Sequence, residues 1–292
     1  HAQGRLRRRR QQAEELRPLS VSVLDDLNAG VREDMQARQR LVTLAELKER
    51  AAAAAPARDA WAALGGTSNT RDQLKVIAEV KRRSPSKGRL ADIADPASLA
   101  AQYADGGAAV ISVLTEERRF GGSLADLDAV RATVDIPLLR KDFMVDEYQI
   151  WEARAHGADL ILLIVASLSD AQLREFTALS RELGMNVLVE THTAEEIERA
   201  VAAEARIIGV NVRNLKTLDV DRSVFAELAG GIPAGALVIA ESGVRDVEDV
   251  KHFAAHGANA VLVGEALVSD ATPRERIAEF MAAGATAIAA RA

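Results

Sequence analysis

The stretch of sequence that decides the fold is Val76-Ile77-Ala78-Glu79-Val80-Lys81-Arg82-Arg83-Ser84-Pro85-Ser86-Lys87-Gly88. It begins as a short run rich in Val and Ile, a pattern typical of a buried strand. Because side chains alternate across a strand, Ile77, Glu79 and Lys81 share one face. The Ser-Pro-Ser-Lys-Gly sequence then ends the strand in a loop. A carboxylate and an ammonium therefore stand at one strand end, either as a structural ion pair or as part of a site.

Similar apolar runs recur along the chain and alternate with helical patterns. The expected strands are Val76–Lys81, Ala109–Leu114, Pro137–Lys141, Asp159–Val165, Asn186–Glu190, Ile207–Asn211, Leu237–Glu241 and Ala260–Val263. The expected helices are Pro96–Asp105, Ser123–Thr133, Asp146–His156, Ser169–Leu183, Thr193–Ala203, Asp221–Ala229, Arg245–His256 and Pro273–Ala290. Strands that alternate with helices predict parallel pairing with right-handed crossovers. The repeated units predict an α/β fold, a single (β/α)8 TIM barrel. The alternative is a doubly wound open sheet, but no G-x-G-x-x-G turn follows the first strand.

The segment before the first strand is expected to add helices to this barrel. Residues 1–19 are rich in arginine and are expected to form a flexible extension. Apolar periodicity predicts helices over Ser20–Arg40 and Thr43–Ala55, within a capping segment of residues 20–64. We therefore expect one barrel domain over residues 20–292.

Composition narrows the class of protein. The chain has 292 residues, 48% of them hydrophobic and 27% charged, which indicates a globular protein. A net charge of -6 argues against an electrostatic nucleic-acid binder. Without cysteine there are no disulfides, and thiolate catalysis and Cys-ligated metals are excluded. No apolar run has the length of a membrane span, and no signal-peptide pattern is visible. We expect a cytoplasmic monomer with no nucleic-acid or membrane partner.

Polar residues gather where the active site of a barrel lies, at the carboxyl ends of the strands. These strand ends carry Glu79, Lys81, Arg140, Lys141, Asp142, Phe143, Glu190, Asn211, Arg213 and Glu241. A single strand-end charge is more often structural than catalytic. Several such ends around one mouth predict a functional site, in which lysines and carboxylates act as proton donors and acceptors.

The last two strand ends suit a phosphate group. Ser242-Gly243 and Gly264 follow the seventh and eighth strands, where barrels often bind phosphate through backbone N–H groups. Ser84 and Lys81 could supply further donors, whereas the alternative is that the glycines only make tight turns.

His192 follows Glu190 into a rim loop and is expected to make a local hydrogen bond, with a substrate contact as the alternative. No metal site is expected, because His252 and His256 share a helix without the Glu of a zincin.

These residues together resemble the signature of the indole-3-glycerol phosphate synthase family. The likeness runs from about Ser20 to about Ala283. The matching motifs are Ile77–Ser86, Phe120–Ser123, Leu139–Phe143, Val189-Glu190, Gly209–Leu215, Ala240–Val244 and Val263–Glu265. Val212 stands where many relatives have a second Asn, which leaves Asn211 as the expected substrate contact.

The resemblance implies a carboxy-lyase of tryptophan biosynthesis that works without cofactor or metal. Its substrate would be 1-(2-carboxyphenylamino)-1-deoxyribulose 5-phosphate, whose ring carbon attacks the ketone before CO2 and water leave. Lys141 would be the general acid at the ketone oxygen, and Glu190 and Lys81 are candidates for the loss of water. Glu79 would tune Lys81. The N-terminal helices would cap the mouth.

The resemblance also implies which residues bind the substrate. Expected contacts to the sugar and ring are Asn211, Arg213, Glu241 and Phe143. The expected phosphate site is Ser84, Ser242, Gly243, Gly264 and the backbone N–H of Glu265. The rival reading is another phosphate-binding barrel, such as a phosphoribosylanthranilate isomerase, and a second rival is a barrel that only binds a phosphorylated metabolite or a partner.

Overall fold

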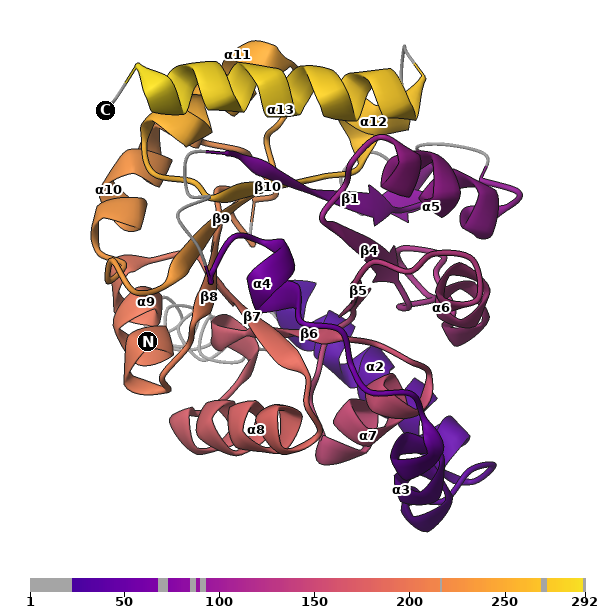
Figure 1. Ribbon diagram of the computed structural model, residues 1–292. Coiled ribbons are helices and arrows are strands. Elements are labelled where there is room, and N and C mark those ends of the chain that lie inside the picture. Colours follow the sequence, from indigo (N-terminus) through magenta and orange to yellow (C-terminus); the bar gives the residue numbers. More distant parts are fainter. Residues whose placement is uncertain are drawn as a thin grey trace, which may run out of the picture.

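A closed barrel of parallel strands forms the centre of the molecule (Figure 1). The computed structural model describes residues 23–67, 73–84, 88–89, 93–215, 217–268 and 272–290. In chain order the barrel strands are β1 (Lys75–Val80), β4 (Val110–Leu114), β5 (Leu138–Lys141), β6 (Leu160–Ile164), β7 (Asn186–Thr191), β8 (Ile207–Asn211), β9 (Leu237–Glu241) and β10 (Ala260–Val263). The ring closes where β1 pairs with β10, with Lys75 opposite Ala260. The predicted (β/α)8 barrel is confirmed, and the open sheet is ruled out.

Helices follow the strands and cover the outside of the barrel (Figure 1). They are α5 (Pro96–Asp105), α6 (Leu124–Arg131), α7 (Glu147–Ala155), α8 (Asp170–Glu182), α9 (Ala194–Ala202), α10 (Phe225–Gly230), α11 (Val247–Ala255) and α13 (Pro273–Ala289). Ser123, Asp146, Ser169 and Thr193 cap the first turns of their helices with side-chain oxygens. The predicted bounds hold within two residues except before α10, where a short 3-10 helix, η3 (Arg222–Val224), comes first.

Several short elements were not predicted. They are α4 (Ala60–Ala63), the 3-10 helix η2 (Val165–Ser167), α12 (Glu265–Val268) and a hairpin of β2 (Arg83–Ser84) with β3 (Gly88–Arg89). Each of these helices and strands has two to four residues, which is too few to leave a periodic apolar pattern.

The strands sort their side chains between two buried layers. On β1, Val76 and Ala78 pack outward against the helices. Ile77 packs inward with Leu139 and Leu188, in the layer that fills the barrel. Glu79 falls on the same face as Ile77, so the predicted alternation places this carboxylate at the inner mouth of the barrel.

The N-terminal helices are distributed over three places. Leu24 and Leu27 of α2 (Val23–Gln39) line the pocket at the carboxyl ends of the strands. The next helix, α3 (Leu44–Ala53), packs against α7 on the outside. Trp61 of α4 packs into the layer that fills the barrel, and its backbone N–H donates to Asn186 at the start of β7. Of the three N-terminal helices that the structure describes, α2 therefore reaches the mouth, while α4 covers the opposite end. The arginine-rich residues 1–19 lie outside the described residues.

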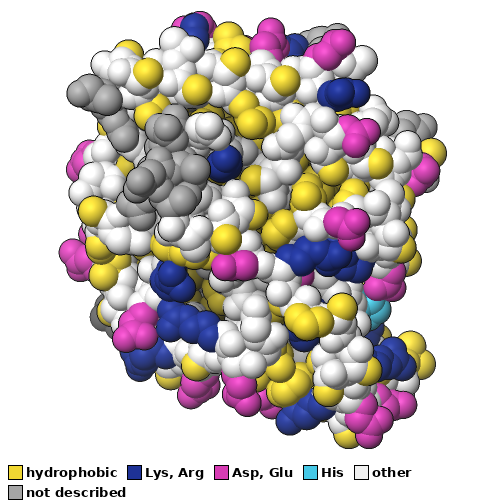
Figure 2. Space-filling model, in the orientation of Figure 1, with side chains coloured by type: hydrophobic (Ala, Val, Ile, Leu, Met, Phe, Trp, Pro, Cys, Tyr) yellow, Lys and Arg dark blue, Asp and Glu magenta, His cyan; other side chains and the backbone are white. Residues whose placement is uncertain are grey.

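The surface carries charges of both signs. On the face shown in Figure 2, acidic and basic side chains are interspersed with apolar ones. Among the described helices, none has the length and hydropathy that crossing a bilayer requires.

Candidate active site

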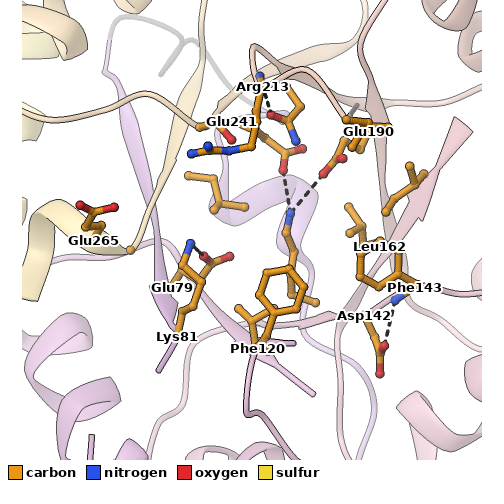
Figure 3. A pocket seen from close by; sticks show the side chains of 18 of the residues that line it. Glu79, Lys81, Phe120, Asp142, Phe143, Leu162, Glu190, Arg213, Glu241 and Glu265 are labelled. Carbon is orange, nitrogen blue, oxygen red and sulfur yellow. Dashed lines mark hydrogen bonds and ion pairs between the residues drawn. The ribbon is translucent and has the colours of Figure 1, made fainter. Parts of the chain in front are cut away.

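A pocket opens at the carboxyl ends of the barrel strands (Figure 3). It brings together the side chains that the sequence placed at strand ends, except Arg140, which is buried behind β5. The predicted residues that line it are Glu79, Lys81, Lys141, Phe143, Glu190, Asn211, Arg213, Glu241, Ser242, Gly243, Gly264 and Glu265. The remaining predicted residue is Ser84, whose side chain lies outside the described part of the chain.

Lys141 is the last residue of β5 and lies between two carboxyl groups, those of Glu190 and Glu241 (both labelled in Figure 3). Its Nζ is 3.2 Å from Glu190 Oε2 and 2.9 Å from Glu241 Oε2. Burial disfavours the ammonium, but the negative charges of Glu241 and Glu190 outweigh it and raise the pKa of Lys141. Lys141 is therefore a charged donor at neutral pH, positioned to give a hydrogen bond or a proton to a substrate oxygen.

The two carboxyl groups beside Lys141 differ in protonation although both are buried. Burial raises the pKa of Glu190, but Lys141 and His192 outweigh burial and hold this pKa well below its usual range. Burial also raises the pKa of Glu241, Lys141 offsets this only in part, and the neighbouring Glu190 raises the pKa further, to about 8. The opposite shifts favour a single proton shared by the pair near neutral pH, with burial favouring its place on Glu241, so that an acid and a base can lie side by side.

Glu241 fits beside Lys141 because β8 carries a glycine at that point. A methyl group on Gly209 would lie 1.9 Å from Glu241 Oε1, far inside van der Waals contact. The same oxygen is buried and makes no hydrogen bond of good geometry within the described residues. Gly209 belongs to a motif noted in the sequence, but the space it leaves for a carboxyl group is visible only in the fold.

A second lysine lies across the pocket at the end of β1. Lys81 Nζ is 2.6 Å from Glu79 Oε1, and Ser112 Oγ donates to Glu79 Oε2 at 3.3 Å. Burial raises the pKa of Glu79, but the charges of Lys81 and Lys141 outweigh burial and lower it. Glu79 is therefore an ionised anchor that fixes the direction of Lys81. This is the geometry that the alternation on β1 predicted.

The loops after β9 and β10 form one end of the pocket. Ser242 and Gly243 both have left-handed backbone, with φ of 68° and 80°. For Ser242 such a conformation is strained, and strain of this kind is typical of functional loops. Gly264 follows β10, and α12 begins at the next residue, Glu265. Both loops thus turn sharply at the mouth, as a backbone phosphate site requires.

Apolar side chains form a wall of the pocket. Phe143, the predicted ring contact, lies with its ring centroid 6.2 Å from that of Phe120 (Figure 3). Leu162 of β6 and Leu24 and Leu27 of α2 extend the wall. In the sequence, Phe120 stood out only as part of a motif, and the apolar periodicity that predicted α2 did not place its leucines at the pocket. Their common surface depends on contacts between distant segments.

Asp142 also borders the pocket, but its carboxylate is engaged elsewhere. Its Oδ2 accepts from Thr115 Oγ1 at 2.6 Å and from Arg140 at 3.1 Å, and its Oδ1 accepts from the backbone of Phe143 at 2.8 Å. Asp142 therefore holds the end of β5 in place.

Comparisons with known proteins find a matching family model, similar sequences and similar folds. The family model for indole-3-glycerol phosphate synthase matches residues 24–280. A protein named indole-3-glycerol phosphate synthase from Arthrobacter sp. (strain FB24) is 83% identical over 271 residues, which cover 93% of this chain and 100% of that relative. One of the same name from Paenarthrobacter aurescens (strain TC1) is 79% identical over 271 residues, with the same coverage of 93% and 100%. Among solved structures, 3-hexulose-6-phosphate synthase from Salmonella typhimurium shares the fold, with a TM-score of 0.59 at 14% identity over 75% of this chain and 100% of that one.

Proposed function

The chain belongs to the indole-3-glycerol phosphate synthase family, and from that premise we propose how its pocket makes indole-3-glycerol phosphate. The substrate is 1-(2-carboxyphenylamino)-1-deoxyribulose 5-phosphate. The reaction is that of a carboxy-lyase in tryptophan biosynthesis, in which a ring closes and CO2 and water are lost.

The observation that carries the proposal is the position of the Lys141 ammonium between two buried carboxyl groups, 3.2 Å from Glu190 Oε2 and 2.9 Å from Glu241 Oε2. As the ring carbon that bears the carboxylate bonds to the ketone carbon, the carbonyl electron pair moves onto the ketone oxygen. Lys141 gives this oxygen a proton. The carboxylate then leaves as CO2, and the electrons of the broken bond restore the aromatic ring.

The loss of water needs an acid and a base. The leaving hydroxyl takes a proton, and the neighbouring carbon, which is bonded to nitrogen, gives one up. Glu190 is the proposed base because its pKa lies well below the usual range, so it is ionised. Lys81 is the proposed acid. It follows β1, across the pocket from Lys141, and its Nζ lies 2.6 Å from Glu79 Oε1. Lys81 can also bind the substrate carboxylate before it leaves.

The rest of the pocket holds the substrate in a reactive pose. Phe143 with Phe120 forms the wall for the aromatic ring. Asn211 and Arg213 bind the sugar chain. The proposed phosphate site is Ser84, Ser242, Gly243, Gly264 and the backbone N–H of Glu265. The leucines of α2 cover this mouth and exclude water, which strengthens each charged contact inside. Since one chain supplies every one of these groups, we propose that a cytoplasmic monomer is active.

The test is an assay of indole formation by the purified protein. Incubation with the carboxyphenylamino substrate should produce the absorbance and fluorescence of indole, with no metal or cofactor added. Incubation with N-(5-phosphoribosyl)anthranilate, the substrate of the rival isomerase, should leave that compound unchanged. Binding of the first substrate without any indole signal would contradict the proposal and favour a barrel of another function.

A further inference from the structure

Glu190 and Glu241 raise a question that Lys141 alone does not answer. Both carboxyl groups are buried, and each contacts the same ammonium through its Oε2. Two buried carboxyl groups that share one cation are expected to have similar affinities for a proton. Some further group must decide which of them stays ionised.

The surroundings of the other oxygen of each carboxyl group differ. Oε1 of Glu190 lies 3.3 Å from His192 Nε2, in an ion pair that is off the ideal direction of a hydrogen bond. Oε1 of Glu241 lies against the α-carbon of Gly209 instead. Glu190 therefore faces a basic side chain on two sides, Lys141 and His192, whereas Glu241 contacts Lys141 on a single side.

His192 is itself held in place from behind. Its Nδ1 lies 3.1 Å from Glu196 Oε2, and its backbone N–H donates to the same oxygen at 2.7 Å. Glu196 is fixed in turn in the first turn of α9, where its backbone N–H donates to Thr193 Oγ1. The expected local hydrogen bond of His192 is confirmed. Burial disfavours an imidazolium, but Glu190 and Glu196 outweigh burial and raise the pKa of His192 to about 10.

We propose that His192, anchored by Glu196, is the positioning residue that assigns the proton at the mouth: its positive charge keeps Glu190 ionised and leaves the proton on Glu241. The inference deepens the proposed function, since it explains why one carboxyl group acts as a base and its neighbour does not.

The charged groups around Glu190 and His192 come from four elements, β1, β5, β9 and α9. Glu190 faces Lys141 from β5 and Glu241 from β9. Lys141 is also influenced by Glu79 from β1. His192 faces Glu190 on one side and Glu196 of α9 on the other. In this set His192 is the group that contacts Glu190 without contacting Glu241.

The first test follows the imidazole of His192 in the wild-type protein by nitrogen-detected NMR, with His192→Asn to assign the signal. We expect both ring nitrogens to stay protonated to about pH 9, roughly two or more pH units above the ordinary histidine pKa. Titration of His192 near the ordinary value would overturn the proposal. This measurement requires no turnover, so it decides the charge of His192 even if the protein makes no indole.

The second test is the pH profile of indole formation. In His192→Asn the acid limb of turnover should move to higher pH by roughly one to three units, the effect of removing an opposite charge at this distance. Glu196→Gln should move the limb in the same direction by less, and His192→Lys, which keeps the charge, should lie closer to wild type. Glu195→Gln removes an exposed charge from the same first turn and should leave the limb in place. An acid limb unchanged in His192→Asn, with turnover merely reduced, would show that His192 only shapes the loop.

Discussion

Strand β5 ends in two neighbouring cations that point to opposite sides of the barrel. Arg140 is fully buried behind the strand and donates to Thr115 Oγ1, Gln149 O, Asp142 Oδ2 and Glu152 Oε2 at 2.9 to 3.1 Å. Lys141 points into the pocket and contacts two carboxyl groups. The two residues carry the same charge one position apart, in very different networks.

The difference lies in how fully each network is satisfied. The carboxylates that accept from Arg140 each accept a further hydrogen bond. Glu152 accepts from Arg38 of α2 at 2.7 Å, and Asp142 accepts from the backbone N–H of Phe143. Around Lys141, Glu241 has an oxygen against Gly209 and a pKa raised to about 8. A saturated buried network fixes one geometry, whereas one that holds a single proton between two carboxyl groups can exchange protons with a substrate. The first therefore stabilises the fold, and the second suits the proposed chemistry.

The largest expected effect comes from breaking the saturated network. Arg140→Leu leaves Asp142 and Glu152 buried without their shared cation, so the free energy of unfolding should fall by about 3–5 kcal/mol. Urea unfolding measures the change. Arg181→Leu, which removes an exposed pair with Glu204, is the control and should cost far less. Equal losses in the two variants would mean that the buried network does not stabilise the fold.

Lys141→Ala removes the cation of the second network and should lower turnover. Turnover should fall at least about a hundredfold, the usual scale of general acid catalysis, which corresponds to about 2.7 kcal/mol in the barrier. The phosphate end of the pocket is unchanged, so the variant should still bind the substrate. Steady-state indole formation and a binding titration measure the two quantities. Near-normal turnover would remove Lys141 from the mechanism.

Gly209→Ala probes the space that Glu241 occupies. The added methyl group would lie 1.9 Å from Glu241 Oε1, so the carboxyl group must move away from its present position. Overpacking of this kind costs about 1–3 kcal/mol of stability, and turnover should fall with it. Gly235→Ala, at a glycine with open space around it, is the matched control. If Gly209→Ala retains wild-type turnover, the position of Glu241 is not critical.

The last prediction is a pH dependence of the free energy of unfolding. The folded pKa of Glu241, about 8, is above its ordinary value of 4.5, so its contribution is fully present below the ordinary value and is lost as pH rises through about 8. Glu190 has the opposite sign, because its lowered pKa stabilises the fold above the ordinary value and loses that effect in acid. Glu241→Gln should therefore flatten the fall of unfolding free energy between about pH 5 and about pH 9 in urea titrations. If the slope of unfolding free energy against pH is the same in Glu241→Gln as in the wild type, Glu241 is not the group that titrates in this range.

The barrel could be predicted from the sequence because its information is local. Strand and helix patterns alternate along the chain, and alternation on β1 put Glu79 and Lys81 on the face of Ile77. The four-residue helices α4 and α12 were missed because one turn shows no period. That α2 reaches the mouth while α4 covers the other end depends on packing between distant segments.

The residues of the pocket could also be predicted, but not their states. Strand ends meet at one rim by topology, so their polar residues converge whatever their roles. The opposite pKa shifts of Glu190 and Glu241 depend on distances between the side chains of Lys141, Glu190, His192 and Glu241, which lie at the ends of β5, β7 and β9. No pattern in the chain encodes such distances. The same holds for Phe120, which joins Phe143 through a tertiary contact.

The most direct test of the central claim is a crystal structure with the substrate whose ketone has been reduced to an alcohol, which cannot react. We predict that its new hydroxyl oxygen lies within hydrogen-bonding distance of Lys141 Nζ. Its phosphate should lie at Ser242, Gly243 and Gly264. A ligand bound with that oxygen away from Lys141, or with its phosphate outside these loops, would contradict the account.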